Sequence, residues 1–183
     1  MALYNKEQLL EMDIPTDLRI LLSNYDCCKS LLDEMESRFF GSDEDVSLFT
    51  HSYLNDEDKK DRDVMNNVSA INEVFKYISF IIETLNGDIV GYWHGLEKRE
   101  MTASPIVLYD TEGQFNILNG SNLTEALVGN YLFDDDEEFL EYQRKFKLCG
   151  IDIVSKWDDL VKPKPKVLPE DIHQEIFKIL NIP

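Results

Sequence analysis

The chain has 183 residues, 43% of them hydrophobic, which suffices for one domain that buries roughly 70% of its unfolded surface without a metal or a disulfide. Asp and Glu number 36 against 18 Lys and Arg, so the formal net charge is −18. A surface of this sign repels nucleic acid and anionic membranes; it either serves solubility alone or steers a basic partner toward the protein.

The N-terminal third predicts helices followed by an acidic insertion. Pro15 stands where the first turn of a helix tolerates it, and the apolar residues between 18 and 39 follow helical spacing. This pattern predicts one long helix or two in tandem, closed by Gly41. From residue 42 to 63 the chain is polar, apart from an apolar pair at 48–49, and we expect an exposed insertion.

The middle of the chain predicts a helix and a first hairpin. Helical spacing runs from Val64 to about Lys76, and residues 77–83 then form an apolar stretch typical of a central strand. Asn86-Gly87 predicts a type I′ turn, because that turn needs positive φ at both central residues. Residues 88–93 are the returning strand.

A second hairpin and two more helices are predicted next. Residues 105–109 and 114–118 are strands around a turn at 110–113. A capping box opens a helix over 122–128, and another helix is expected over 137–149 with Gly150 as its stop.

The last part of the chain, residues 151–183, is predicted to be a C-terminal extension. Residues 151–160 form an edge strand or a helical turn, residues 162–166 form a stiff basic linker, and residues 169–180 form a helix. The expected fold is α+β: a single domain with an antiparallel meander sheet of four or more strands, packed by helices.

Three segments carry a resemblance to a known family: residues 14–18, residues 86–93 and residues 104–113. Over residues 14–25 and 78–128 the chain resembles the SUKH superfamily, the Syd-like and Smi/Knr-like proteins. The resemblance implies a meandering sheet packed by helices and no catalytic machinery. It also implies protein binding, as immunity proteins that neutralise toxins, often nucleases, or as interaction hubs in fungal relatives.

The candidate partner surface consists of acidic runs and one aromatic side chain. Dense carboxylates could imitate the phosphates that a nuclease site holds and speed encounter with a basic toxin. The run at 134–138 lacks the spacing of a calcium loop, so capping and solvation of the following helix are favoured over a metal site; capping is compatible with partner contact. The candidate residues are Asp43, Glu44, Asp45, Asp56, Glu57, Asp58, Trp93, Asp134, Asp135, Asp136, Glu137 and Glu138.

The aromatic candidate is weighed against a core position. Strand alternation puts Tyr92 and Trp93 on opposite faces, so at least one of them is expected in the core, and a core position is favoured for Trp93. His94 is interpreted as a surface or hydrogen-bonded histidine rather than a base or ligand.

No motif of a serine hydrolase, phosphate loop, zinc peptidase or paired-cysteine site occurs, so neither an enzyme nor a cofactor is predicted. The cysteines, Cys27, Cys28 and Cys149, are expected to be buried thiols. Without a leader-like N-terminus or a run of roughly 18 apolar residues, a cytoplasmic protein is expected. The sequence thus favours an immunity protein against a cognate toxin; the alternative is a regulatory scaffold with several clients, and a small hydrolase using His94 comes third.

Overall fold

The computed structural model describes residues 2–42, 45–132 and 135–182 and confirms the predicted α+β fold. A six-stranded sheet has the order β1-β3-β4-β5-β6, with β2 also on β3. From β3 to β6 every pair is antiparallel, which confirms the predicted meander, whereas β1 is parallel to β3. The strands are β1 Ala2–Leu3, β2 Ser37–Phe39, β3 Ile78–Thr84, β4 Ile89–Trp93, β5 Ile106–Tyr109 and β6 Phe115–Ile117.

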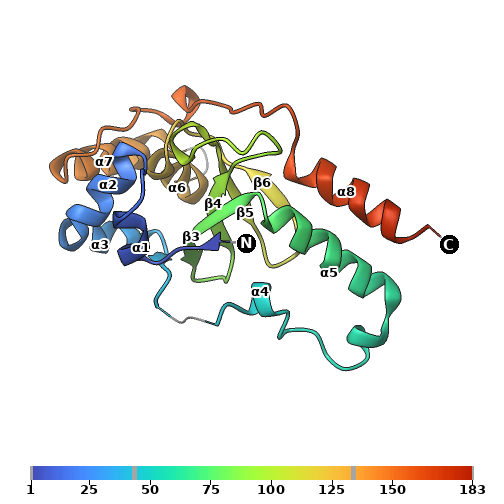
Figure 1. Ribbon diagram of the computed structural model, residues 1–183. Coiled ribbons are helices and arrows are strands. Elements are labelled where there is room, and N and C mark those ends of the chain that lie inside the picture. The colour runs from blue at the N-terminus through green and yellow to red at the C-terminus, as the bar shows by residue number, and fades with distance from the viewer. Residues whose placement is uncertain (1, 43–44, 133–134, 183) are drawn as a thin grey trace.

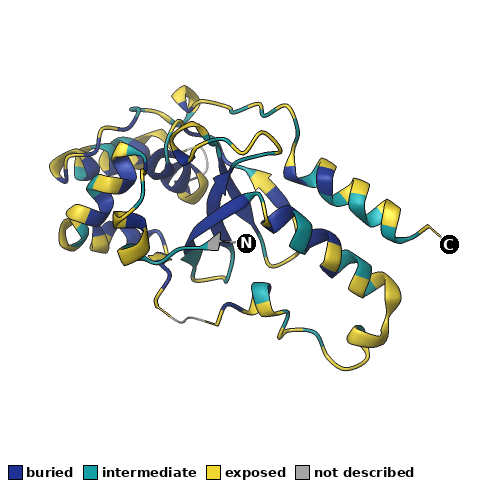
Figure 2. Cartoon of the chain, viewed as in Figure 1, coloured by how far each residue is buried: buried dark blue, intermediate teal, exposed yellow. Residues whose placement is uncertain are grey.

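Helices cover both faces of this sheet (Figure 1). One face carries α1 Lys6–Leu10, α2 Thr16–Ser23, α3 Tyr25–Glu34, α6 Leu123–Leu132 and α7 Asp136–Leu148; the other carries α4 Ser47–Thr50, α5 Arg62–Phe75 and α8 Pro169–Leu180. Short 3₁₀ turns lie at Asp58–Lys60 (η1), Met101–Ala103 (η2) and Trp157–Asp159 (η3). The central strands are buried between the two layers (Figure 2), because their side chains are apolar on both faces.

Strand β3 contains an irregularity that serves both layers. Its pairing with β4 shifts register between Phe80 and Ile82. Phe80 faces the layer of α5 and α8, whereas Ile81 and Ile82 both face the layer of α6 and α7. A β-bulge of this kind lets two consecutive side chains enter one core. Opposite it, Gly91 lies so close to β3 that an added Cβ would sit 2.3 Å from the carbonyl oxygen of Ser79.

The predicted N-terminal helices are present as two in tandem, α2 and α3. They end at Glu34, earlier than the helical spacing of apolar residues up to position 39 predicted. Phe39, the last apolar residue of that pattern, lies in β2 and pairs with Ile82. The chain leaves the helix at Glu36, whose φ is 53°. Pairing with the open edge of β3 therefore overrides the helical periodicity, as tertiary contacts commonly do.

The prediction of a type I′ turn at Asn86-Gly87 is wrong. Thr84 N–H donates to the Asp88 carbonyl at 2.9 Å, and Gly87 N–H donates to the Thr84 carbonyl at 2.9 Å. Only Gly87 has a positive φ, of 86°. The loop thus has three residues, with glycine in the left-handed position of a bulged hairpin.

The expected exposed insertion at 42–63 is anchored where the structure describes it. Val46 and Leu48 are buried, and Phe49 packs edge-on against Phe75 and Phe80, with ring centroids 5.2 Å apart in each case. The polar residues around these anchors remain exposed. The apolar residues 46–49 of this acidic segment are therefore packed against α5 and the sheet face that α5 covers.

The C-terminal extension is integrated into the fold. Residues 151–160 form the η3 turn and no strand, residues 162–166 are extended coil, and α8 occupies the predicted range. Val161 accepts a backbone hydrogen bond from Gly120 at 2.7 Å, and Ile172 is buried. These contacts tie residues beyond Gly150 to both the sheet and α6.

The expectation of free cysteines is wrong for two of them. Cys27 on α3 and Cys149 after α7 form a disulfide, with their Cα atoms 5.9 Å apart. Cys28 is free and buried. Neighbouring residues on one helix cannot pair with each other, and the partner of Cys27 comes from a helix that packs against α3 only in the folded chain.

Candidate functional site

Some residues of the acidic run at 134–138 cap α7, and others are exposed to solvent. Asp134 lies outside the described residues. Asp135 is the N-cap of α7, and its Oδ1 accepts a hydrogen bond from Glu138 N–H at 3.0 Å. Asp136 accepts one from Trp157 N–H at 3.1 Å. The capping interpretation is therefore confirmed for Asp135, while Glu137 and Glu138 point their exposed carboxylates away from the core.

The other acidic segment precedes α5. Asp43 and Glu44 lie outside the described residues, and Asp45 is exposed. Asp56 and Glu57 are exposed, and Asp58 Oδ2 accepts a hydrogen bond from Asn55 N–H at 3.0 Å. Further on, Asp61 caps α5 through the backbone of Asp63 and Val64. This segment is thus a defined turn with carboxylates on its outside.

The fold does not bring these two acidic runs together. The run at 135–138 opens α7, which packs on one face of the sheet, and the run at 56–58 leads through η1 into α5 on the other face. Figure 1 shows α7 and the start of α5 at opposite ends of the molecule. A partner of ordinary size would contact one run or the other, so the candidate residues do not form a single surface.

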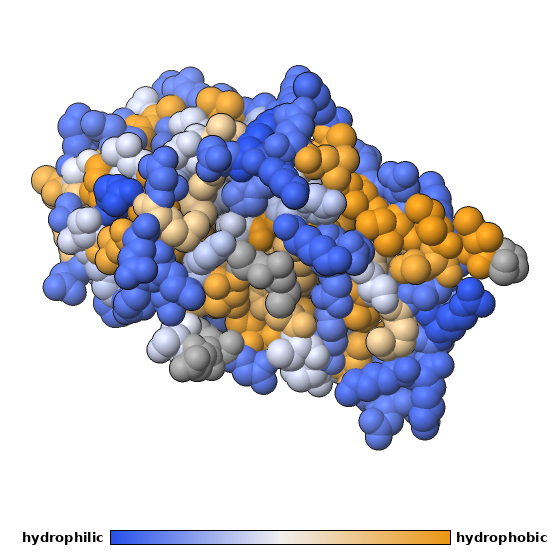
Figure 3. Space-filling view, viewed as in Figure 1, coloured by the Kyte–Doolittle hydropathy of each residue, from blue (hydrophilic) through white to orange (hydrophobic). Residues whose placement is uncertain are grey.

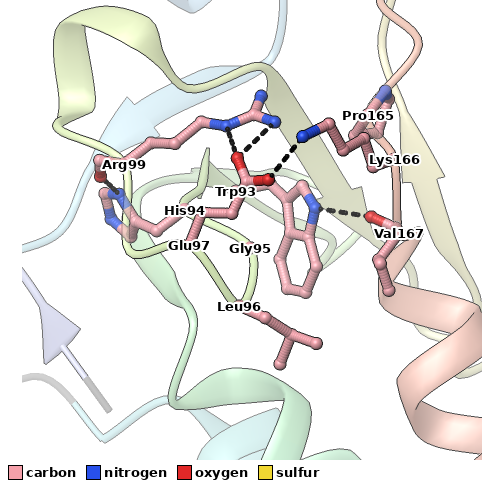
Figure 4. Close-up of a pocket in the computed structure, with 9 residues that line it drawn as sticks. All are labelled: Trp93, His94, Gly95, Leu96, Glu97, Arg99, Pro165, Lys166 and Val167. Carbon is pink, nitrogen blue, oxygen red and sulfur yellow. Dashed lines mark hydrogen bonds and ion pairs between the residues drawn. The ribbon is translucent and has the colours of Figure 1, made fainter.

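Trp93 is not a surface anchor. Its side chain is 1% exposed, and its Nε1–H donates to the Val167 carbonyl at 3.2 Å. Figure 4 shows the segment Pro165–Val167 lying across the indole, held by Lys166, whose Nζ is 3.0 Å from Glu97 Oε1. The space left beside the indole is about 30 Å³, which is the size of one water molecule. Trp93 is therefore a core residue, as was favoured from strand alternation, and its place among the candidate partner contacts is corrected.

His94 makes hydrogen bonds on both ring nitrogens. The Arg99 carbonyl lies 2.7 Å from Nδ1, so Nδ1 carries the proton, and Nε2 accepts the Ser79 hydroxyl at 2.7 Å. Ser79 is buried in β3, and the pair lines a cleft of about 400 Å³. The arrangement ties β3 and β4 to the loop that follows, which confirms the interpretation of a hydrogen-bonded histidine.

Two buried carboxylates were missed by sequence reasoning. Asp17 at the start of α2 accepts hydrogen bonds from Thr124 N–H at 3.1 Å and Thr124 Oγ1 at 3.3 Å. Burial raises the pKa of Asp17 more than these hydrogen bonds lower it. Glu125 accepts from Ser121 N–H at 2.8 Å and from Val154 N–H at 3.1 Å. Both carboxylates bind the ends of segments that meet at α6, which is a structural role.

Asp17 also lines a cleft of about 480 Å³, formed by the start of α2, the N-terminal end of α6 and residues 150–152. Below it the Tyr92 hydroxyl is buried without a hydrogen-bond partner in the described structure. Burial, and to a smaller extent the charge of Asp17, raise the pKa of Tyr92 well above its usual value. Tyr92 is therefore a buried core side chain whose environment favours the neutral phenol.

An apolar strip on α8 is the second feature that sequence reasoning missed. Figure 3 shows hydrophobic side chains continuing along α8 toward the C-terminal end. Leu168 is 42% exposed, Ile179 58% and Ile182 65%. Helical spacing places Ile172, Ile176 and Leu180 on one face of the helix predicted over 169–180, but the apolar sector of α8 is wider than that face. The signal was present in the sequence, in the extra isoleucine at 179.

The described residues contain neither a metal-binding cluster nor a helix that could cross a membrane. No group of three or more His, Cys, Asp or Glu side chains is arranged to hold a metal ion among them. No helix within the described ranges combines the length and the apolar character that crossing a membrane requires. In comparisons with known proteins, no family model, no curated protein and no solved structure matches the chain.

Proposed function

We propose that this chain is a protein-binding module of the SUKH type that neutralises a cognate basic toxin by covering it. The observation that carries the proposal is the set of exposed carboxylates at Asp56, Glu57, Glu137 and Glu138, which make no ion pair within the described structure. Together with the net charge of −18 they favour attraction of a positively charged protein.

The fold supports this proposal at a coarser level. An antiparallel meander with helices on both faces agrees with what the SUKH resemblance implies. The hydrogen bonds of His94 to Ser79 and to the Arg99 carbonyl give that histidine a structural task, which favours binding over catalysis. Fold alone does not determine function, so the partner must be found by measurement.

The test is a calorimetric titration of the protein with the product of a toxin-like gene encoded beside it, at low and high salt. We expect one-to-one binding that weakens with salt, because exposed charge pairs are screened. A double variant, Glu137→Gln with Glu138→Gln, is compared with Asp56→Asn with Glu57→Gln to locate the charges involved. Binding that ignores salt and both variants contradicts steering by these carboxylates.

A regulatory scaffold that recruits several clients is the alternative that the resemblance also implies. Affinity capture with the whole chain distinguishes the two. One dominant, tight partner supports the immunity protein, and several weak partners support the scaffold. Absence of any toxin-like partner in both experiments would refute the immunity proposal.

A cytoplasmic location belongs to the same proposal and conflicts with one observation. Disulfides are rare in the reducing cytosol, yet Cys27 and Cys149 form one. Thiol counting decides between them, on cells quenched with acid and protein then alkylated under denaturing conditions, so that the buried Cys28 also reacts. Reaction of Cys28 alone would place the chain in an oxidising compartment, whereas reaction of all three cysteines would agree with the cytoplasm.

A further inference from the structure

Helices α5 and α8 form an arm that projects from the sheet. The buried residues of α5 belong to its second half, from Val68 to Phe75, and those of α8 are Pro169 and Ile172 at its start. Because the helices run antiparallel, the first half of α5 and the second half of α8 form the outer end. We call residues 61–67 and 173–182 the helical arm; Figure 1 shows it extending beyond the strands.

The arm is held together by polar contacts rather than by a core. Arg62 Nη2 donates to the Leu180 carbonyl at 3.3 Å. Asn66 Nδ2 donates to the same carbonyl at 3.2 Å and to Asn181 Oδ1 at 2.7 Å. His173 Nε2 lies 2.8 Å from Asn67 Oδ1. These contacts fix the outer end of α8 to α5, while Ile176 packs against the edge of the core and Phe177 stacks on His173.

Two apolar side chains at the outer end of the arm face water. Ile179 and Ile182 are 58% and 65% exposed, and Ile176, Phe177 and Leu180 are only half-buried. Figure 3 shows this strip as a continuous hydrophobic band that ends at the described C-terminus. Isolated exposed apolar residues are ordinary, but a contiguous strip rimmed by charge is typical of a surface that binds another protein.

Beside that strip lies a charged segment in which carboxylates outnumber cations by five to three. The segment 56–63 carries Asp56, Glu57, Asp58, Asp61 and Asp63 against Lys59, Lys60 and Arg62. It runs through η1 into α5, and Arg62 touches Leu180, so this acidic segment lies beside the outer end of α8. The strip and the charges thus belong to one end of the molecule.

The apolar strip and the neighbouring acidic segment together indicate which kind of partner could bind there. A second copy of the chain would place the same carboxylates, and a net charge of −18, against each other. A partner helix with apolar residues on one face and Lys or Arg along its flank satisfies both the strip and the neighbouring charges, with its apolar face laid against the strip. The charge complementarity therefore favours a basic amphipathic helix.

We propose that the helical arm is the docking surface for a basic amphipathic helix of the partner protein. The inference rests on the proposed function, because it places that partner on the arm and not at the run before α7. It assigns the binding contacts to Ile179 and Ile182, and the steering charges to the segment 56–63.

The probe is a synthetic amphipathic peptide of leucine and lysine, titrated into the whole chain by fluorescence anisotropy. The test variant is Ile179→Ser with Ile182→Ser, both at exposed positions whose replacement should leave the fold intact. The matched control is Leu148→Ser, at an 87% exposed leucine on α7 outside the arm. We expect the arm variant to weaken binding about tenfold and the control to leave it unchanged.

The contribution of the carboxylates to peptide binding is tested with two matched double variants. Asp56→Asn with Glu57→Gln should reduce the salt dependence of peptide binding, whereas Glu137→Gln with Glu138→Gln should not. Equal effects of the two pairs, or unchanged affinity in the isoleucine variant, would overturn the assignment. Sedimentation equilibrium that shows a dimer dissolved by the isoleucine changes would give the strip to a second copy and overturn it as well.

Titration with the neighbouring toxin separates this inference from the proposed function. If the toxin binds the parent chain and the arm variant equally well, the docking surface is refuted while toxin binding stands. If the peptide binds the arm but no toxin-like protein binds at all, the docking surface stands while the immunity function fails.

Discussion

Replacing Trp93 by alanine tests whether this residue is a core side chain or a partner anchor. The indole is 1% exposed, and truncating a buried aromatic ring to alanine costs about 3–5 kcal/mol. The hydrogen bond to the Val167 carbonyl is lost as well, and it contributes about 1 kcal/mol. Since domains of this kind are stable by roughly 5–15 kcal/mol, Trp93→Ala should lose about a quarter or more of the free energy of unfolding.

The comparison variant is Trp93→Phe, which keeps an aromatic ring and removes only the N–H and part of the packing. We expect it to cost about 1–3 kcal/mol, because the Val167 carbonyl loses its donor. Urea unfolding followed by far-ultraviolet circular dichroism gives both values, with an unchanged m-value as the check for two-state behaviour. If Trp93→Ala unfolds within 1 kcal/mol of the parent protein but fails to bind a partner, the core assignment is wrong.

Three further predictions concern single residues. Asp17→Asn should be at least as stable as the parent at pH 7. Burial raises the pKa of Asp17 in the folded protein, so its protonated form stabilises the fold fully below the unfolded pKa of 3.8, and this stabilisation is lost as the pH rises through the folded pKa. If the free energies of unfolding of variant and parent followed parallel curves against pH, this reasoning would be refuted. Gly91→Ala should cost about 3 kcal/mol or more in thermal unfolding, because the added Cβ meets the Ser79 carbonyl at 2.3 Å; a neutral effect would mean that β3 and β4 separate easily. Cys27→Ser should cost about 2–4 kcal/mol by removing a link to Cys149 across 122 residues, and reductant should destabilise the parent but not the variant.

The sequence predicted the elements well where a local signal exists. Pro169 begins α8 at its first position, and Gly150 ends α7 with a φ of 89°, as expected of these residue types. The features that it missed depend on contacts between distant segments. Cys149 carries no local mark of its partner, and Asp17 is acidic in a first helical turn, which normally faces water, yet here it is buried against α6.

The candidate site was predictable only in part, for a related reason. Composition indicated acidic runs, but whether two runs share a surface depends on which face of the sheet each one reaches. Alternation along β4 correctly favoured a core position for Trp93, whereas its cover, the segment at Val167, comes from a part of the chain that looks like a linker. The exposed strip at Ile179 required knowing how much of α8 the neighbouring α5 covers.

The contacts of residues 161–180 have a consequence for synthesis of the protein. They complete a face whose other buried members, from Phe40 to Phe115, are made much earlier. Until this late segment has left the ribosome, the indole of Trp93 lacks its cover and the second layer lacks a helix. The nascent chain therefore passes through a period in which one sheet face is exposed to water. During that period, rapid completion of synthesis and folding, or binding by chaperones, protects it from aggregation.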